Sequence, residues 1–417
     1  MPRFPAGPLP SYDLRMSADR YLDALVFRRV GYRYRKHGFT FDLSQALFSS
    51  AGVDAGTHLL LALIAAEADS RDYERVVDLG SGTGTLGICL AGSSGAALEA
   101  VDRDALAVVF TERNARLNGL ERFSARVGLM PAAPPDDARE LVVSNLPAKA
   151  GEPVLRMLIA AILRRAALGG GASAMVVVKP LGTLLADELE QRGAEVLAER
   201  HTANHTAVVC RCPVVPEIAH DDELSAFVRD SCEFQGPERP YVLQTVYNLP
   251  EFDGLSFRTA LAFDLLRESR VSASVLLYGC GQGHLLVGLA QRASRRCAFA
   301  IADRDVLSLR ISVRNAERAG IEPVRSRTVP TAGCLAEDDW AGRSSWIVVN
   351  DDPTPGSGWN DEVLELSRSL LADGGRLLLV ARSTAVSRFE RAARSSYVRT
   401  AERRMHGYRA SLFRRGR

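Results

Sequence analysis

The sequence predicts two tandem α/β domains, each built on a mostly parallel sheet, and three observations lead to this fold class. The chain has 417 residues, which is long for one domain and suits two of about 200 residues each. Apolar runs of strand length alternate with helical patterns, as in a parallel sheet covered on both faces. The glycine-rich segment Arg75–Gly87, RVVDLGSGTGTLG, returns in a similar form at Val275–Leu286, VLLYGCGQGHLL. The chain therefore carries an internal duplication.

The elements of the first half follow the order of such a sheet. Gly38–Ser44 alternates like a strand, and His58–Ala68 has the apolar pattern of a helix. Asp104 is a suitable N-cap for the helix Asp104–Asn118, and Gly119 is suited to end it. The other expected elements are the strands Ala97–Asp102, Glu140–Asn145, Ala172–Lys179 and Thr206–Arg211, and the helices Val154–Leu168 and Leu184–Arg192.

The second half repeats this order about 200 residues later. Ala100–Asp104, AVDRD, returns as Ile301–Asp305, IADRD, and Leu141–Asn145, LVVSN, returns as Trp346–Asn350, WIVVN. A segment rich in proline and polar residues interrupts the pattern between the halves. We expect a mobile N-terminal segment at 1–26, a first domain at 27–212, a linker and lead-in segment at 213–253, and a second domain at 254–417.

Composition excludes several classes of protein. The seven cysteines include no CxxC pair, so neither a disulfide framework nor a zinc site is expected, and no other metal site is predicted. No run of 18 apolar residues and no signal-peptide pattern occur, so we expect a cytoplasmic protein without a membrane span. The sequence predicts no oligomeric state.

The net charge of +2 is too small to indicate a nucleic-acid partner, but its distribution is uneven. Arg376–Arg417 contains twelve arginines and only two acidic residues, Glu390 and Glu402. Such a basic segment could follow a phosphate backbone, or it could be a solvated surface in an arginine-rich protein. Both interpretations remain open at this point.

Carboxylates around the first glycine-rich loop indicate its cofactor. Asp78 lies two residues before Gly80, and Asp102 ends the next strand, where a carboxylate typically binds ribose hydroxyls. The GxGxG spacing of Gly80–Gly84 differs from the GxGxxG of pyrophosphate loops. A cofactor with a ribose, a positive centre and no phosphates fits, and this predicts S-adenosylmethionine. The predicted cofactor-binding residues are Asp78, Gly80, Ser81, Gly82, Thr83, Gly84, Asp102, Arg103 and Asn145.

The segment after the fourth strand indicates the chemistry. Strand carboxyl ends line the ligand crevice of a doubly wound sheet, so Asn145 is expected to face the methyl group. The side-chain carbonyl of Asn145 and the backbone carbonyl of Leu146 can accept both hydrogens of a planar amine, and Pro147 fixes the turn between them. Asn145, Leu146 and Pro147 are therefore the predicted catalytic residues. An Asx-Pro turn without function is the alternative.

These residues carry a resemblance to a known family. Asn145–Gly151, NLPAKAG, is similar to the Asn-Pro-Pro motif of amino-directed methyltransferases, and most similar to the small-domain methyltransferases that modify guanine N2 in small-subunit ribosomal RNA. Phe39–Leu60 resembles the lead-in strand and helix of that family, and Asn204–Val209 resembles its last strand. The resemblance covers about residues 27–212. Leu146 replaces the first proline of the motif, and Ala148 stands where the family has an aromatic residue.

The resemblance implies two tandem Rossmann-like methyltransferase domains, each a mostly parallel seven-stranded sheet with helices on both faces. It implies an S-adenosylmethionine-dependent N-methyltransferase acting on a guanine exocyclic amine in ribosomal RNA. Two other functions remain open. One is methylation of a small metabolite or a protein side chain, and the other is a non-catalytic role in RNA binding or assembly.

The second copy is expected to have lost its chemistry. Tyr278 replaces the first carboxylate, although Asp303 and the three glycines remain. The strand end that corresponds to the first-domain motif reads Asn350–Pro353, NDDP, with two charges where carbonyls should converge. We expect the second domain to be a structural partner or an RNA-holding module.

Overall fold

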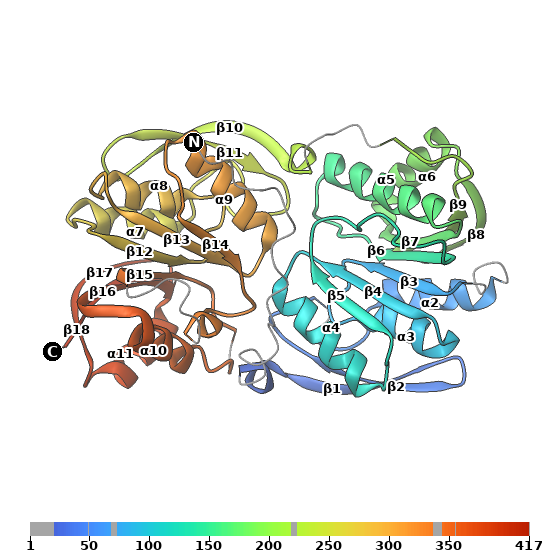
Figure 1. Cartoon of the computed structure of the whole chain (residues 1–417), viewed down its shortest axis with the longest axis horizontal. Coiled ribbons are helices and arrows are strands. Elements are labelled where there is room, and N and C mark those ends of the chain that lie inside the picture. The colour runs from blue at the N-terminus through green and yellow to red at the C-terminus, as the bar shows by residue number, and fades with distance from the viewer. Residues whose placement is uncertain are drawn as a thin grey trace.

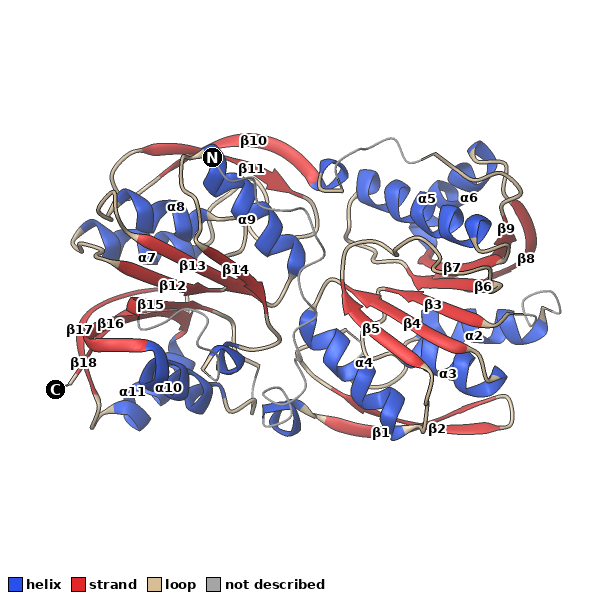
Figure 2. Cartoon of the chain, in the orientation of Figure 1, coloured by secondary structure: helices blue, strands red, loops and turns tan. Residues whose placement is uncertain are grey.

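The computed structural model describes residues 21–48, 50–67, 73–217, 223–336, 344–354 and 356–416. Two sheet domains lie side by side, the first on the right and the second on the left of Figure 1. Figure 2 shows that the parallel strands of both sheets point toward the centre of the molecule. The carboxyl edges of the two sheets therefore face each other.

The first domain begins with an antiparallel hairpin, β1 (Arg28–Tyr34) and β2 (His37–Leu43). Its seven-stranded sheet has the order β5-β4-β3-β6-β7-β9-β8, and β9 runs antiparallel to both of its neighbours. The strands are β3 (Arg75–Leu79), β4 (Ala97–Asp102), β5 (Phe123–Val127), β6 (Glu140–Asn145), β7 (Ala172–Val178), β8 (Glu195–His201) and β9 (His205–Arg211). The helices are α2 (Ala55–Ala66), α3 (Thr85–Ser94), α4 (Ala105–Leu117), α5 (Glu152–Leu168) and α6 (Gly182–Gln191).

The second domain repeats this architecture, again beginning with a hairpin, β10 (Val228–Gln235) and β11 (Pro240–Val246). Its sheet has the corresponding order β14-β13-β12-β15-β16-β18-β17. The strands are β12 (Ser274–Tyr278), β13 (Ala298–Asp303), β14 (Arg325–Thr328), β15 (Ser344–Asn350), β16 (Leu371–Arg382), β17 (Tyr397–Met405) and β18 (Tyr408–Arg415). The helices are α7 (Phe257–Arg267), α8 (His284–Gln291), α9 (Val306–Arg318), α10 (Trp359–Leu370) and α11 (Ser383–Ala393), and short 3₁₀ turns occur at Lys179–Leu181, Ser225–Phe227 and Ala332–Leu335.

The predicted fold class is confirmed: both domains are mostly parallel seven-stranded sheets with helices on both faces. Asp104 caps α4 by accepting a hydrogen bond from the N–H of Leu106 at 2.9 Å, and Gly119 follows the helix with φ of 70°. The seven-stranded sheet implied by the resemblance includes β5 and β8, but the sequence pattern assigned no residues to these two strands. Each lies at an edge of the sheet and is only partly buried, so neither shows the continuous apolar run of a central strand. Within the described ranges, no helix is both long and apolar enough to cross a membrane.

The prediction that residues 1–26 form a mobile segment is wrong for the last residues of this range. Residues 21–25 are helical, and Tyr21, Leu22 and Leu25 are buried in a cluster with apolar side chains of the second domain. The hydroxyl of Tyr21 donates to a carboxylate oxygen of Glu365 at 2.6 Å. Residues 1–20 lie outside the described residues. The expected linker at 213–253 contains the hairpin β10–β11, which is the counterpart of β1–β2.

Each domain packs one helix against the apolar cluster of the other domain. Side chains of α4 (Leu106, Val109, Phe110) belong to the apolar cluster of the second domain, and side chains of α9 (Val306, Leu307, Ile311) belong to that of the first. The backbone N–H of Ala105 donates to the carbonyl of Arg304, and the N–H of Val306 donates to the carbonyl of Arg103, both at 2.9 Å. The repeats therefore meet with approximate two-fold symmetry.

Candidate functional site

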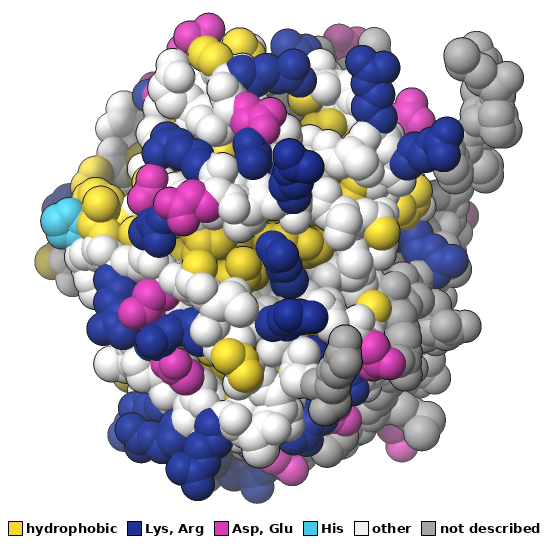
Figure 3. Space-filling model, turned by 90° about the vertical axis from the view of Figure 1, so that its left-hand side faces the viewer, with side chains coloured by type: hydrophobic (Ala, Val, Ile, Leu, Met, Phe, Trp, Pro, Cys, Tyr) yellow, Lys and Arg dark blue, Asp and Glu magenta, His cyan; other side chains and the backbone are white. Residues whose placement is uncertain are grey.

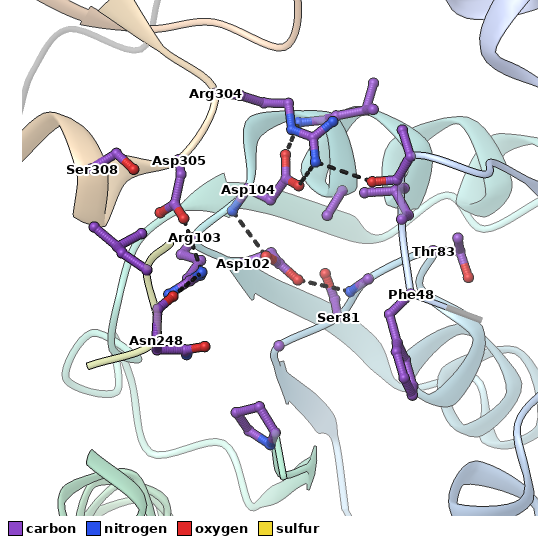
Figure 4. A pocket seen from close by; sticks show the side chains of 18 of the residues that line it. Phe48, Ser81, Thr83, Asp102, Arg103, Asp104, Asn248, Arg304, Asp305 and Ser308 are labelled. Carbon is purple, nitrogen blue, oxygen red and sulfur yellow. Dashed lines mark hydrogen bonds and ion pairs between the residues drawn. The ribbon is translucent and has the colours of Figure 1, made fainter. Parts of the chain in front are cut away.

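A cavity of about 1000 Å³ lies between the two carboxyl edges. The first domain lines it with the glycine-rich loop, Asp102 and the segment 144–149, and the second domain contributes Tyr278 and Asp303, among others. Figure 4 shows the part of this cavity around Asp102, where the second domain approaches. The cavity is large enough for a cofactor and a planar group beside it.

The glycines of the first loop have two different roles. Gly80 and Gly82 have φ of 76° and 57°, and a Cβ built on either would meet nothing within 4 Å. These two positions leave room for a ligand to approach the backbone. A Cβ on Gly84 would lie 2.8 Å from Ile88 and 2.9 Å from Thr111, so this glycine allows α3 to pack closely at its start.

Asp102 is held by two backbone groups at the end of β4. One oxygen accepts from the N–H of Gly82 at 2.8 Å and the other accepts from the N–H of Asp104 at 2.9 Å. Each oxygen keeps a further lone pair, so the carboxylate can still accept hydrogen bonds from a diol. Burial, together with the nearby charge of Asp104, raises the pKa of Asp102 to about 6.

Asp78 lies deeper, below the loop, and is almost completely buried. One of its oxygens accepts from the N–H of Gly87 at 2.9 Å, in the first turn of α3. A Cβ on Gly87 would lie 2.9 Å from the same oxygen, which explains the glycine at this position. Burial raises the pKa of Asp78 to about 7, so ionisation of this carboxyl is unfavourable unless a positive group is near.

The side-chain amide of Asn145 has a defined orientation. Its Nδ2 donates to Oδ1 of Asp54 at 3.0 Å and to Oγ1 of Thr57 at 3.3 Å. Asp54 is itself the N-cap of α2 and accepts from the N–H groups of Gly56 and Thr57. Because both amide hydrogens face the start of α2, Oδ1 of Asn145 points away from it as an acceptor.

Leu146 is the next residue along the chain. Its side chain is buried, its N–H donates to the carbonyl of Val176 at 3.0 Å, and it lines the cavity. Among the described residues, no hydrogen bond uses Oδ1 of Asn145 or the carbonyl oxygen of Leu146. Sequence reasoning missed Asp54, although an aspartate just before an apolar helix is a recognisable capping signal.

Most of the predicted site residues come together, but Arg103 has a different environment. Its Nη2 donates to the carbonyl of Asn248 at 2.8 Å and pairs with Asp305 at 3.0 Å, both in the second half of the chain. Figure 4 shows Arg103 directed toward these two residues. These contacts assign Arg103 to the domain interface and give no support to its predicted role in cofactor binding.

The corresponding part of the second domain also lines the cavity, but its backbone contacts differ. A Cβ on Gly279 would lie 2.0 Å from the carbonyl oxygen of Asn350, whereas the equivalent Gly80 faces open space. Nδ2 of Asn350 donates to the carbonyl of Gly279 at 3.0 Å, so this amide is turned into the protein. Asp303 still accepts from the N–H of Gly281 and the N–H of Asp305. The second copy thus keeps the ribose-type carboxylate, but the amide that corresponds to Asn145 bonds to its own glycine-rich loop.

The arginine-rich segment covers the end of β16, the helix α11 and the strands β17 and β18. Arg403 and Arg409 pair with carboxylates at α7, α11 and β17, while Arg388, Arg391 and Arg394 are exposed on and just after α11. Figure 3 shows the outer face of the second domain, where basic side chains are widely spread with acidic ones between them. Several arginines of this segment are thus engaged in ion pairs, and the two interpretations of the basic segment remain open.

Comparisons with known proteins agree with this geometry. Residues 38–199 match the sequence model of the family described as "Methyltransferase small domain". A segment of 88 residues is 36% identical to a ribosomal RNA small subunit methyltransferase C from Chromohalobacter salexigens, and it spans 21% of this chain and 26% of that protein. The structure of the T. thermophilus 16S rRNA guanine N2 methyltransferase RsmC, in complex with AdoMet and guanosine, superposes with a TM-score of 0.60. That match covers 94% of this chain and 99% of that one at 18% identity, which establishes a shared fold.

Proposed function

Because residues 38–199 match the methyltransferase small domain, we propose that this protein is an S-adenosylmethionine-dependent N-methyltransferase. Its first domain holds the cofactor and acts on the exocyclic amine of a guanine in ribosomal RNA. The second domain holds no working site and supports the first. The names of the C. salexigens and T. thermophilus relatives support ribosomal RNA as the substrate class.

The residues of the first domain suit this cofactor. Asp102 has the free lone pairs that a ribose diol needs, and the open space at Gly80 and Gly82 admits close contact with the backbone. Asp78 would hold the positively charged amino-acid end, directly or through water, and this favours the ionised carboxylate. S-adenosylmethionine, when bound, supplies an electrophilic methyl group.

The acceptors at the end of β6 suit a planar amine. The lone pair of an exocyclic guanine nitrogen is delocalised into its ring. When Oδ1 of Asn145 and the carbonyl of Leu146 accept both amine hydrogens, the nitrogen is turned so that its lone pair faces the cofactor side of the cavity. Positioning of this kind can contribute a large part of the rate enhancement without a strong base. The base must leave its stack to reach the cavity if it lies in a helix.

The observation that carries the proposal is the orientation of the Asn145 amide by Asp54 and Thr57. An asparagine in a simple Asx-Pro turn would bond to its own backbone, and this one bonds to the start of another helix. Asn145 and Leu146 line the same cavity as the predicted cofactor residues, which supports the proposal.

The test is methyl transfer from labelled S-adenosylmethionine to separated RNA, protein and metabolite fractions from cells lacking the protein. We expect label in ribosomal RNA as N2-methylguanine. Asn145→Ala should reduce transfer by at least about 100-fold, the lower range for loss of a key catalytic group, with cofactor affinity nearly unchanged. Asn350→Ala, at the equivalent position of the second domain, is the matched control and should keep full activity.

Other outcomes would decide between the remaining functions. Label confined to protein or to metabolites would exclude RNA as the substrate. Tight cofactor binding without transfer to any fraction would favour a non-catalytic role in RNA binding or assembly. Full activity of Asn145→Ala would contradict the assignment of the amine site.

A further inference from the structure

We propose that Phe48 is the face on which the target base stacks, and that Arg304 of the second domain positions the loop that carries it. This inference rests on the proposed function, because it assigns a nucleobase subsite within the same cavity. The sequence lacks an aromatic residue at Ala148, where the family motif has one. A planar base held only at its amine edge would have no surface against its ring.

Among the Phe, Tyr and Trp side chains that line the described cavity, Phe48 is the one exposed enough to take this role. Phe227, Tyr278 and Trp359 also line the cavity, but their exposed fractions are only 3%, 4% and 6%. Phe48 is 75% exposed, which is unusual for a large apolar residue beside a cavity. Figure 4 shows its ring standing free on the side of the cavity where Ser81 and Thr83 lie. Stacking on a base would remove an apolar surface from water.

The loop also connects Phe48 to the amine acceptor. Phe48 belongs to the segment between β2 and α2, and the same segment ends at Asp54, the residue that orients Asn145. Phe48 and Asn145 line the same cavity, so a base whose amine contacts Oδ1 of Asn145 shares this cavity with the ring of Phe48. Face and edge of the base would be recognised by one loop and the residue that it orients.

The second domain holds this loop in place. Arg304 donates through Nη2 to the carbonyl of Ala46 at 3.0 Å and pairs with Asp104 at 2.8 Å. Ala46 and Leu47 pack against the apolar cluster of the second domain. The residues just before Phe48 are thus anchored, whereas Phe48 itself projects into the cavity.

The duplication provides an internal comparison. In the mirror contact, Arg103 donates to the carbonyl of Asn248, which makes Asn248 the counterpart of Ala46. Two residues further along, the counterpart of Phe48 is Pro250. The anchoring arginine occurs in both repeats. The counterpart loop carries an exposed ring at Phe252, but among the described residues this ring does not line the cavity, whereas Phe48 does. The inference therefore gives the second domain a specific task, to position the stacking residue of the first.

The test measures binding of a short single-stranded RNA that contains one guanine, and of the same strand with an abasic residue at that position. S-adenosylhomocysteine is present to fill the cofactor site. Phe48→Ala should weaken binding of the guanine strand by roughly 10-fold, as expected for loss of one base–aromatic stack, and should leave binding of the abasic strand unchanged. Phe48→Trp should restore the preference, and its fluorescence should be quenched by the guanine strand more than by the abasic strand. Phe257→Ala, which removes a ring 52% exposed outside the cavity, is the matched control.

Arg304→Gln should lower the preference for the guanine strand and reduce the fluorescence quenching in the Phe48→Trp background. Asp305→Asn removes the corresponding ion pair with Arg103 and leaves the Phe48 loop unchanged. This variant should keep both the preference for the guanine strand and the fluorescence quenching. A wild-type protein that binds the two strands equally would overturn this inference together with the proposed function. A wild-type preference that Phe48→Ala retains would overturn the stacking role alone. If Phe48→Ala weakened the binding of S-adenosylhomocysteine as much as the binding of the guanine strand, the ring would contact the cofactor. This result would also overturn the stacking role.

Discussion

Replacing Asp78 by asparagine should make the cofactor-free protein more stable and the cofactor complex weaker. The new amide would keep an oxygen acceptor for the N–H of Gly87, at the position where Asp78 accepts at 2.9 Å, and would remove a charge on a residue that is only 1% exposed. Burial raises the pKa of Asp78 from its ordinary value of 3.8 to about 7. Between pH 3.8 and about 7, Asp78 is therefore more often protonated in the folded protein than in the unfolded chain.

The size of the effect follows from this difference. Each unit of pKa corresponds to about 1.4 kcal/mol, so the ionised Asp78 costs as much as about 4 kcal/mol of folding free energy at pH 8. At pH 5 the carboxyl is mostly protonated in the folded state, and the cost falls to about 2 kcal/mol. Wild-type stability contributed by this group thus decreases as the pH rises from 4 to 7 and is level above that.

The assay compares thermal unfolding of the wild type and Asp78→Asn without cofactor at pH 8 and pH 5. We expect an increase in Tm of roughly 10 °C at pH 8 and about half of that at pH 5, for a domain of this size. The exposed Asp187→Asn is the control and should change Tm little at either pH. Cofactor affinity, measured by calorimetry, should fall at least about 10-fold in Asp78→Asn.

The reasoning would be refuted by an Asp78→Asn protein that melts at or below the wild-type Tm at pH 8. Equal stabilisation at pH 5 and pH 8 would likewise contradict it, because the charge would then not be the cause. Unchanged cofactor affinity would show that the cofactor does not use the negative charge of Asp78.

Three further predictions concern other residues of the first domain. Because burial raises the pKa of Asp102 to about 6, cofactor affinity should fall as the pH is lowered from 8 to 5, and a flat calorimetric profile would argue against a ribose contact by the ionised carboxylate. Gly151→Ala should lower both Tm and methyl transfer, because φ of Gly151 is 87° and the new Cβ would lie 2.4 Å from the ring of Tyr247. Adding Tyr247→Ala should restore part of the activity. If the double variant recovered no activity, backbone strain alone would be the cause. Arg165→Met should destabilise the first domain by about 3–5 kcal/mol in denaturant unfolding, because the buried Glu140 loses its closest partner, Nε of Arg165 at 2.6 Å. A loss of stability below about 1 kcal/mol would show that this ion pair is dispensable.

Much of the candidate site could be predicted because it is encoded locally. Asp78, Asp102 and Asn145 each lie at or next to the end of a strand with an apolar pattern, and parallel strands bring their carboxyl ends to one edge of a sheet. The glycines of the loop are recognisable by their spacing. The duplication was visible for the same reason, because the repeated segments are the buried strands and the turns that leave them.

Other parts were invisible to these patterns. Arg103 follows Asp102 directly, and only the packing of the second domain shows that it turns to Asn248 and Asp305. The hairpin β10–β11 lies in a segment that is rich in proline and polar residues, and its strands are only half buried. Its pattern is therefore weaker than that of a central strand.

The fold class, the repeat and the group of residues around the glycine-rich loop could be read from the sequence, since periodicity and capping depend on near neighbours in the chain. Three features became visible only in the folded molecule: how the two repeats meet, which way the amide of Asn145 faces, and that Phe48 is exposed at the cavity while Arg304 bonds to the carbonyl of Ala46. These features depend on contacts between residues 91 and 258 positions apart. No local pattern records such a contact, because it exists only once both domains have folded and packed together.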